Sequence, residues 1–290
     1  MKQIKESELI LNPDGSIYHL NLRPEHLAND VIFVGDQDRV EEITKYFDTI
    51  EFSTQKREFK TQTGTYKGKR ISVVSTGIGP DNIDIVLNEL DALVNIDFAT
   101  RTVKPQLTRL NIVRVGTSGS LQAHIPVDAL LMSVAAIGTD NMLRSYHLHN
   151  VQQQAMEQAF VKHTNWEITD GMPYAVEADP EMIAKFKSEN LFEGITITAG
   201  GFYGPQGREL RLKVKDEQLN DKMDAFEFEG VKATNLEMET AAIYGLSKLL
   251  GHKAVSLNAI VANRKNGTFS LNPYKTIDNL IQFALNKIIE

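Results

Sequence analysis

Cysteine is absent from the 290 residues of this chain. Its absence excludes a disulfide-stabilised scaffold, catalysis by a thiolate and zinc sites with thiolate ligands. A surplus of positive charge is also lacking, because 31 Lys and Arg residues stand against 38 Asp and Glu residues and the formal net charge is −7. Proteins that bind nucleic acids usually present a basic surface, so we expect no nucleic-acid partner. An anionic ligand would have to be held by a few locally concentrated cations.

Long apolar segments are missing as well. The longest uncharged apolar run covers residues 129–138 and is too short to cross a bilayer. The N-terminus carries no apolar stretch of signal-peptide length. With a mean hydropathy of −0.25, the chain is expected to be a soluble, cytoplasmic protein without a membrane partner.

The apolar residues that are present follow strand and helix periods in alternation. Strands are predicted at 31–34, 109–116, 129–138, 195–201 and 254–263, with a hairpin over 61–75. Helices are predicted at 39–47, 83–94, 151–163, 180–191 (after Asp179 as N-cap), 239–251 (ending at Gly251) and 276–289. Neither a flexible linker nor a repeat divides the chain. We therefore predict an α/β fold, a single domain with a central mixed β-sheet flanked by helices on both faces, in which ligands collect where strands end in loops.

The first strand end with candidate chemistry is the segment GDQDRV at 35–40. Gly35 lets an anion approach the backbone closely, and Arg39 in the first helical turn adds positive charge. The alternative is an ordinary strand-to-helix turn in which Asp36 or Asp38 caps the helix. Taken alone, this segment favours the ordinary turn.

A second candidate is RVGTSGS at 114–120, where Arg114 interrupts an apolar strand. A buried arginine must either be paired within the protein or meet an anion. The small residues that follow, Thr117 among them, offer amides and hydroxyls that suit phosphate. An arginine at a sheet edge before a turn is the alternative, and the segment alone does not decide between them.

The loop GGFYGPQGRELR at 200–211 joins aromatic residues to hydrogen-bonding ones. A planar ring can stack on Phe202 or Tyr203, while Gln206 and Arg208 hydrogen-bond its edge. A surface loop with a packed aromatic residue is the alternative.

Two carboxylates, Glu237 and Glu239, lie in the apolar strand-to-helix junction TNLEMETAAIYG. Extended geometry places both on one side with Met238 opposite. Such a carboxylate can accept hydrogen bonds from the vicinal diol of a ribose. Alternatively, Glu239 only favours the start of the helix.

Metal and nucleophile chemistry find little support in this sequence. The motif HLH at 147–149 has no third ligand nearby, so a loop is favoured over a metal site. A GxSxG nucleophile elbow is also missing.

In their order along the chain, these motifs resemble those of the nucleoside phosphorylase family, and within it the uridine phosphorylase group. The motifs are GDxxRV, REF, STGIG, RxGTSG, FYxxQGR and NxEMET, and the resemblance runs from about His19 to the C-terminus. It implies a phosphorylase-like domain at 19–290 preceded by an N-terminal extension at 1–18. The sequence departs from the family pattern at Pro80-Asp81 and in the glycine and proline of FYGPQGR, and the segment 97–108 has no clear counterpart.

The resemblance also implies three groups of site residues. Phosphate would be bound by Gly35, Arg39, Arg114 and Thr117, together with Arg57 from a neighbouring subunit. Ribose would be bound by Glu237, Met238 and Glu239, together with His19 from a neighbouring subunit. The base would be bound by Phe202, Gln206, Arg208 and Arg264.

The implied reaction is the reversible phosphorolysis of uridine, or of deoxyuridine or thymidine, to uracil or thymine and the pentose 1-phosphate, as in pyrimidine salvage. Inorganic phosphate would be the co-substrate, no cofactor or metal would be required, and a monovalent cation at the subunit interface could involve Glu58 and Ser75. Self-association into a dimer or a hexamer of three dimers is implied too. The alternatives are a purine nucleoside phosphorylase, a hydrolytic nucleosidase or a non-catalytic nucleoside-binding protein. A pyrimidine is favoured because Asn263 stands where purine-specific relatives carry an aspartate.

Overall fold

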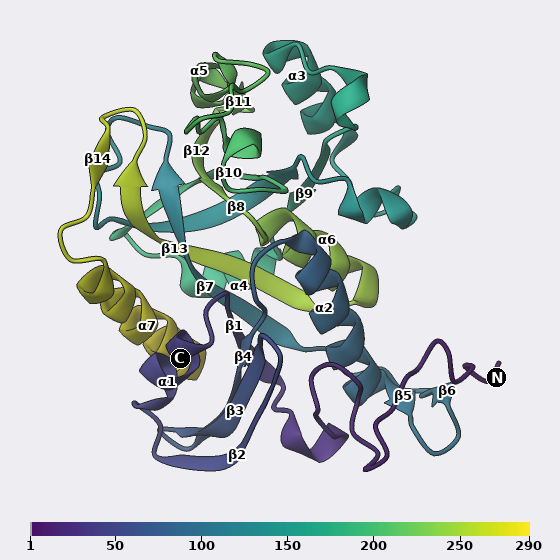
Figure 1. Ribbon diagram of the computed structural model, residues 1–290. Coiled ribbons are helices and arrows are strands. Elements are labelled where there is room, and N and C mark those ends of the chain that lie inside the picture. Colours follow the sequence, from purple (N-terminus) through teal and green to yellow (C-terminus); the bar gives the residue numbers. More distant parts are fainter. Residues whose placement is uncertain (1) are drawn as a thin grey trace.

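A twelve-stranded β-sheet forms the centre of the computed structural model, which describes residues 2–290 (Figure 1). The strands in chain order are β1 (Asp30–Val34), β2 (Thr49–Lys56), β3 (Phe59–Tyr66), β4 (Lys69–Ser75), β5 (Ile96–Asp97), β6 (Thr102–Val103), β7 (Asn111–Ser120), β8 (Leu130–Gly138), β9 (Tyr174–Glu177), β10 (Leu191–Thr198), β11 (Glu227–Phe228), β12 (Val231–Glu237), β13 (Lys253–Asn263) and β14 (Thr268–Phe269). The spatial order is β11-β12-β10-β8-β13-β7-β1-β4-β3-β2, with β9 beside β8 and β14 beside β13, whereas β5 and β6 pair apart from it as a two-stranded sheet. Parallel and antiparallel pairs both occur, so the sheet is mixed as predicted.

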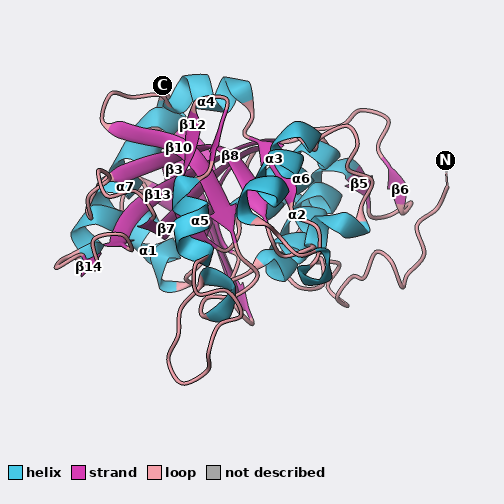
Figure 2. Cartoon of the chain, turned by 90° about the horizontal axis from the view of Figure 1, so that it is seen from above, coloured by secondary structure: helices cyan, strands magenta, loops and turns pink. Residues whose placement is uncertain are grey.

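Within residues 2–290, seven α-helices surround this sheet. They are α1 (Asp38–Thr44), α2 (Pro80–Asn95), α3 (Gln154–Thr164), α4 (Pro180–Phe186), α5 (Leu219–Ala225), α6 (Thr240–Leu250) and α7 (Pro273–Ile289). Figure 2 shows the strands running between α1 and α7 on one side and α2 and α6 on the other. The predicted single-domain α/β fold with helices on both faces is confirmed.

Strand β1 shows why its sequence is an unbroken apolar run. Val31 and Phe33 pack in the core cluster that contains α2 and α6, whereas Ile32 and Val34 pack in the cluster that contains α1, α4 and α7. Successive side chains of a strand point to opposite faces, so a strand covered on both faces is apolar at every position. β1 pairs in parallel with β4 and β7 and lies inside the sheet.

Part of the sheet closes on itself, which the sequence did not predict. Strand β12 pairs in parallel with β10 and also, antiparallel, with the end of β7 at Asn235–Ser120 and Leu236–Gly119. Strands β7, β13, β8, β10 and β12 therefore form a closed ring, from which β1, β4, β3 and β2 extend as an open sheet. The closure brings the ends of β7 and β12 side by side.

Several local signals are confirmed. The carboxylate of Asp179 accepts the backbone N–H groups of Glu181 and Met182 at 3.0 and 3.1 Å and so caps α4. Gly251 ends α6 in the left-handed conformation, with φ of 81°. The predicted hairpin is formed by β3 and β4.

Other boundaries differ from the prediction. Helix α4 ends at Phe186, five residues before the predicted end, because Lys187 is already extended and the following chain enters β10 at Leu191. Consequently β10 begins and ends earlier than the predicted strand at 195–201. Strand β2 was not predicted, because this edge strand is largely exposed and its sequence TIEFSTQK lacks a sustained apolar period.

The N-terminal segment and residues 97–108 pack on each other beside the end of α2 (Figure 1). Arg101, in the β5–β6 hairpin, donates from Nε to the carbonyl of Ile4 at 2.9 Å and from Nη2 to the carbonyls of Lys5 and Leu9. Leu9 is buried in the same cluster as α2. The two segments without counterparts in the motifs thus form one packed unit.

Within residues 2–290, no helix combines the length and apolar character needed to span a membrane.

Candidate active site

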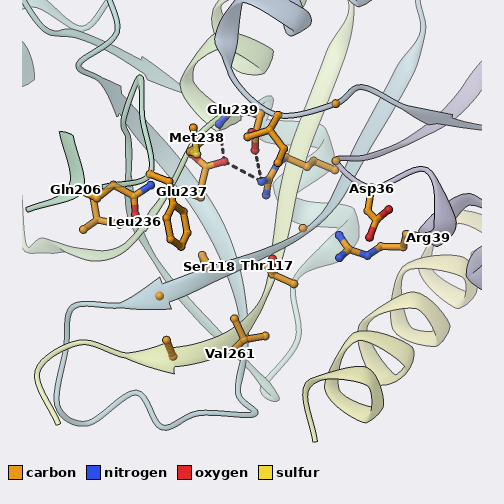
Figure 3. Close-up of a pocket in the computed structure, with 18 of the residues that line it drawn as sticks. Asp36, Arg39, Thr117, Ser118, Gln206, Leu236, Glu237, Met238, Glu239 and Val261 are labelled. Carbon is orange, nitrogen blue, oxygen red and sulfur yellow. Dashed lines mark hydrogen bonds and ion pairs between the residues drawn. The ribbon is translucent and has the colours of Figure 1, made fainter. Parts of the chain in front are cut away.

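A cavity of about 800 Å³ opens where β1, β4, β7 and β12 end, at the carboxyl edge of the parallel strands (Figure 3). Ten of the predicted site residues line it, namely Gly35, Arg39, Arg114, Thr117, Phe202, Gln206, Arg208, Glu237, Met238 and Glu239. They come from segments more than 200 positions apart in the chain. Figure 3 shows Arg39 and Gln206 on opposite sides of the cavity, with Glu237 and Glu239 between them. We call these two sides the Arg39 end and the Gln206 end.

The Arg39 end carries a guanidinium with an unused donor. Arg39 Nε is buried and has no hydrogen-bond partner within residues 2–290, and its Nη1 makes one long bond of 3.5 Å to the carbonyl of Val115. Burial lowers the pKa of Arg39, although Asp36 opposes this shift. A buried, unpaired donor is costly, so this geometry calls for an acceptor from a ligand. Gly35 and Thr117 border the same space.

Asp36 makes the helix-entry turn that was the alternative for this segment. Its Oδ1 accepts the backbone N–H of Asp38 at 3.0 Å. This turn and the cavity position of Arg39 occur together, so the two interpretations of GDQDRV are compatible.

Arg114, 7% exposed, is paired with the two carboxylates of the β12–α6 junction. Its Nη2 lies 2.6 Å from Glu239 Oε2 and 3.0 Å from Glu237 Oε2, and its Nη1 donates to Asn258 Oδ1 at 3.0 Å. Burial opposes the charged form, but Glu237 and Glu239 outweigh it and raise the pKa of Arg114. Any anion that meets Arg114 in the cavity therefore meets a cation largely neutralised by its neighbours.

The two carboxylates are themselves held by the backbone. Glu239 Oε1 accepts the N–H of Gly79 at 2.8 Å. Glu237 accepts the Thr198 hydroxyl at 2.6 Å and the N–H groups of Glu239 and Thr240, both at 2.9 Å. Burial raises the pKa of Glu239, against the lowering effect of Arg114. These bonds fix both carboxylates at the middle of the cavity and leave spare lone pairs on Glu239.

Both carboxylates contact one guanidinium, so they lie on the same side, as predicted. Met238 also lines the cavity and is not turned away from it. The reason is that the chain leaves the strand conformation here, with φ −137° and ψ −25° at Glu239 just before α6.

The Gln206 end combines an aromatic face with amide and guanidinium groups. The guanidinium carbon of Arg208 lies 3.8 Å from the centre of the Phe202 ring, and its Nη1 donates to Gln206 Oε1 at 2.5 Å. Gln206 is 2% exposed, whereas Phe202 is 51% exposed. Arg208 therefore covers one face of the Phe202 ring and orients the Gln206 amide, and a ring in the cavity could use only the other face of Phe202.

Arg264 lies behind this end and is not among the residues that line the cavity. Burial and the nearby charge of Arg208 lower its pKa to about 10. Its Nη1 is buried without a hydrogen-bond partner in the part of the chain that the structure describes. Two neighbouring guanidinium groups without a carboxylate favour an electron-rich ligand on this side.

His19 and Arg57, predicted to serve a neighbouring subunit, are not among the residues that line the cavity of their own chain. Arg57 forms the β2–β3 turn with φ of 56°, is exposed, and its side chain makes no hydrogen bond or ion pair within residues 2–290. His19 pairs with Glu89 of α2 at 2.6 Å. Neither residue therefore contributes to the cavity of its own chain.

Asn258 was missed by the sequence analysis. It is fully buried on β13, where its amide oxygen accepts from Arg114 and its nitrogen donates to Ser133 at 3.3 Å. A lone asparagine inside the apolar run AVSLNAIVAN was the available signal. Asn82, after the unusual Pro80-Asp81, also lines the cavity without having been predicted.

Asn263, on which the prediction of a pyrimidine base rests, does not line the cavity. Its amide donates to the carbonyls of Gln122 and Ile125 at 2.9 and 2.8 Å, and its oxygen accepts the N–H of Asn266. These hydrogen bonds hold together the loops around residues 122–125 and 263–266.

The groups considered for a cation offer few free oxygens. The Ser75 hydroxyl donates to the carbonyl of Glu58 and accepts the N–H of Lys60, both at 2.7 Å. One chain therefore supplies little more than the Glu58 carboxylate, too few ligands for a cation site by itself. The described residues contain no metal-binding cluster of His, Cys, Asp and Glu, and the HLH segment is a loop.

Comparison with known proteins identifies relatives over almost the whole chain. Residues 29–285 match the profile of the phosphorylase superfamily. The structure superposes on that of a Trypanosoma brucei nucleoside phosphorylase, described as showing uridine phosphorylase activity, with a TM-score of 0.87 and 30% identity, over 97% of this chain and 99% of the other.

Curated relatives differ in the base named. A uridine phosphorylase of Thermococcus kodakarensis is 28% identical over 88% of this chain and 80% of its own length. A DeoD-type purine nucleoside phosphorylase of Listeria monocytogenes is 25% identical over 94% of this chain and 99% of its own length.

Proposed function

Because the chain belongs to the phosphorylase superfamily and is a pentosyl-transferring enzyme, we propose that it catalyses the reversible phosphorolysis of uridine. The products are uracil and ribose 1-phosphate, with deoxyuridine and thymidine as further substrates of the same chemistry. The family uses phosphate as co-substrate, and the proposed role is pyrimidine nucleoside salvage in the cytoplasm. The names of the Thermococcus and Trypanosoma relatives support uridine.

The observation that carries the proposal is the order of groups across the cavity. A guanidinium with an unsatisfied buried donor lies at the Arg39 end, the two fixed carboxylates lie in the middle, and an amide with a stacked guanidinium lies at the Gln206 end. This order matches phosphate, pentose and base in the sequence in which a nucleoside and its attacking phosphate must line up.

In the proposed mechanism, the bond between the pentose anomeric carbon and the base nitrogen breaks, and a phosphate oxygen bonds to the same carbon. Positive charge develops on the sugar, where a phosphate dianion at the Arg39 end stabilises it and then captures it. The electron pair of the broken bond leaves with the base, whose oxygens are stabilised by Gln206 and Arg208. The base then takes up one proton from water, and the water regains it from the phosphate group of the new ribose 1-phosphate.

The carboxylate pair contributes by orientation. Glu239 accepts from the ribose hydroxyls, with Glu237 close by, while Arg114 and the backbone hold both carboxylates rigid. Well-oriented reactants can lower a barrier by about 7–11 kcal/mol. The proposed sugar contact of Met238 places the ring against its thioether.

The test is an assay of uridine, thymidine and inosine with and without inorganic phosphate. We expect uracil release from uridine that depends on phosphate. Equal release without phosphate would identify a nucleosidase, and faster cleavage of inosine would favour the purine activity named for the Listeria relative. Wild-type protein that binds uridine without turning it over would be a binding protein.

We also propose that the active site is shared between subunits, with Arg57 of one chain completing the phosphate site and His19 the ribose site of the next. Support comes from their absence from their own cavity and from the Arg57 guanidinium, which has no hydrogen-bond or ion-pair partner among residues 2–290. A dimer is the minimal assembly, and a hexamer of three dimers has the same contacts. Mass measurement in solution distinguishes these from a monomer, which would contradict the proposal.

The domain division at 1–18 and 19–290 remains a proposal, supported by the match over residues 29–285. The monovalent cation is proposed only for an interface to which both chains contribute ligands, since one chain offers too few, and no catalytic step is assigned to it.

A further inference from the structure

Glu89 of α2 gathers three hydrogen-bond donors of the segment around His19. Its carboxylate accepts the backbone N–H of His19 at 3.1 Å, the backbone N–H of Leu20 at 2.9 Å and the imidazole Nδ1 of His19 at 2.6 Å. The Glu89 side chain is only 13% exposed. A single side chain therefore fixes both the backbone and the ring of one residue.

The same segment is also held from the β2–β3 hairpin. Lys56 Nζ donates to the carbonyl of Tyr18 and to Asn12 Oδ1, and it lies 4.4 Å from the centre of the Tyr18 ring. The His19 ring packs edge-on against Tyr18 and Phe59, with centroid distances of 4.8 and 6.3 Å. His19 is thus held from two elements, while its side chain remains 26% exposed.

The Glu89 contact also selects the protonation site of the imidazole. A carboxylate opposite Nδ1 keeps a hydrogen on Nδ1, so the neutral ring has a bare Nε2 that accepts hydrogen bonds. No described residue occupies Nε2. An accepting nitrogen on a rigid, partly exposed ring is suited to a hydroxyl group supplied from outside the chain.

We propose that Glu89 is a positioning residue that holds His19 in the Nδ1–H form for the 5′-hydroxyl of a nucleoside bound in the neighbouring subunit. This inference rests on the proposed function, from which the target of His19 is taken. The competing explanation is that Glu89 only stabilises the turn of the chain at residues 19–20. In that case its loss would affect all substrates alike.

The first experiment compares uridine with 5′-deoxyuridine, which lacks the hydroxyl, in wild type and in the variants Glu89→Gln, His19→Ala and the double variant. We expect Glu89→Gln to lower kcat/KM for uridine about fivefold to tenfold, with a change below about twofold for 5′-deoxyuridine. The ratio of kcat/KM for uridine to kcat/KM for 5′-deoxyuridine should be the same in the double variant as in His19→Ala.

Equal losses of kcat/KM on both substrates, or no loss on either, would overturn the inference and leave the proposed function intact. A wild type that uses both nucleosides equally would overturn it too, because there would be no hydroxyl contact to position. A wild type without uridine phosphorolysis would overturn the proposed function and, with it, the substrate target of this inference.

A second measurement does not depend on activity. Imidazole ¹⁵N chemical shifts of the assembled wild-type protein, assigned with His19→Ala, should show His19 in the Nδ1–H form at a pH where the ring is neutral. In Glu89→Gln this population should shift toward the Nε2–H form. An unchanged tautomer in the variant, with the protein still folded by its thermal unfolding curve, would contradict the positioning role.

Discussion

At the scale of single residues, the site balances buried charges that would be costly alone. Arg114 is 7% exposed and faces Glu237 and Glu239, each 5% exposed. Removing Arg114 would leave two buried carboxylates without their cation, at a cost of about 3–5 kcal/mol. A loss of activity in an Arg114 variant would therefore combine catalysis with stability. Arg39 is the cleaner probe, since its Nε has no protein partner among residues 2–290.

We predict that Arg39→Ala raises the KM for phosphate about tenfold or more while changing the KM for uridine little, because a charge-assisted hydrogen bond contributes about 1.5–3 kcal/mol. Initial rates at varied phosphate and fixed uridine measure this. The control is Arg109→Ala, an exposed arginine just before β7, at the opposite end of that strand from the cavity. Equal effects of the two substitutions would show that Arg39 contributes only general charge.

The raised pKa of Glu239 gives a second prediction. Burial favours its neutral form, so Glu239 takes up a proton at a higher pH than an ordinary glutamate, whose pKa is about 4.3. Protonation removes an acceptor for ribose, and kcat/KM for uridine should fall as the pH is lowered toward that range. The ratio of wild type to Glu239→Gln should decline over the same pH interval, because the ionisation of phosphate cancels in the ratio. A ratio independent of pH would exclude Glu239 as the titrating group.

At the scale of elements, the cavity lies at strand ends, and some elements that stabilise the fold lie away from it. Gly79 precedes α2 with φ of 103°. Its N–H donates to Glu239, which lies at the β12–α6 junction, 160 positions further along the chain. Helix α6 begins directly after the carboxylate pair and ends at Gly251. Helix α4, by contrast, contributes no residue to the cavity. Stability and activity can therefore be changed separately.

We predict that Asp179→Ala lowers the free energy of unfolding by about 1 kcal/mol, because two N–H groups at the start of α4 lose their acceptor. The kcat/KM should stay unchanged, since α4 lies away from the cavity. Urea unfolding at one fixed protein concentration measures the first and the uridine assay the second. Asp179→Asn is the matched control and should retain most of the stability. A loss of activity without a loss of stability would contradict this separation.

At the scale of the whole molecule, an acidic chain builds a cavity rich in arginine. The net charge is −7, yet Arg39, Arg114 and Arg208 border one cavity and Arg264 lies behind it. Clefts with low-dielectric walls concentrate such a local potential, so overall charge does not prevent anion binding. His19 and Arg57 do not line the cavity of their own chain. Under the proposed function they reach substrates only in the cavity of a second chain.

We predict complementation between two impaired variants, Arg39→Ala and Arg57→Ala, when they are co-expressed. If each site combines Arg39 of one chain with Arg57 of its dimer partner, random mixing restores about a quarter of the sites, because half of the dimer pairs are mixed and one of the two sites in each mixed pair is intact. The assay measures phosphate-dependent uracil release per subunit. It is run on the unfractionated protein and on mixed assemblies purified through two different tags, one on each variant. Activity equal to the mean of the two variants would show that each chain forms its own complete site.

The sequence by itself determined the α/β class and the kinds of side chain at the strand ends. Apolar runs such as VIFV report burial on both faces, and local signals such as Asp179 and Gly251 act within a few residues of themselves. The edge strand β2 and the early end of α4 escaped prediction, because pairing with β3 and the start of β10 overrode weak local preferences.

Only the tertiary structure decided which of these groups meet. Each motif taken alone had an ordinary alternative, because neither Arg114 nor Glu239 reveals its partner in the sequence. Pairing between the ends of β7 and β12 closes part of the sheet and brings the Arg114 guanidinium within 2.6 Å of Glu239. Asn258 joins them from β13, and His19 is turned away to Glu89. Such contacts join residues far apart in the chain, so they follow from the packing of whole elements and not from any local pattern.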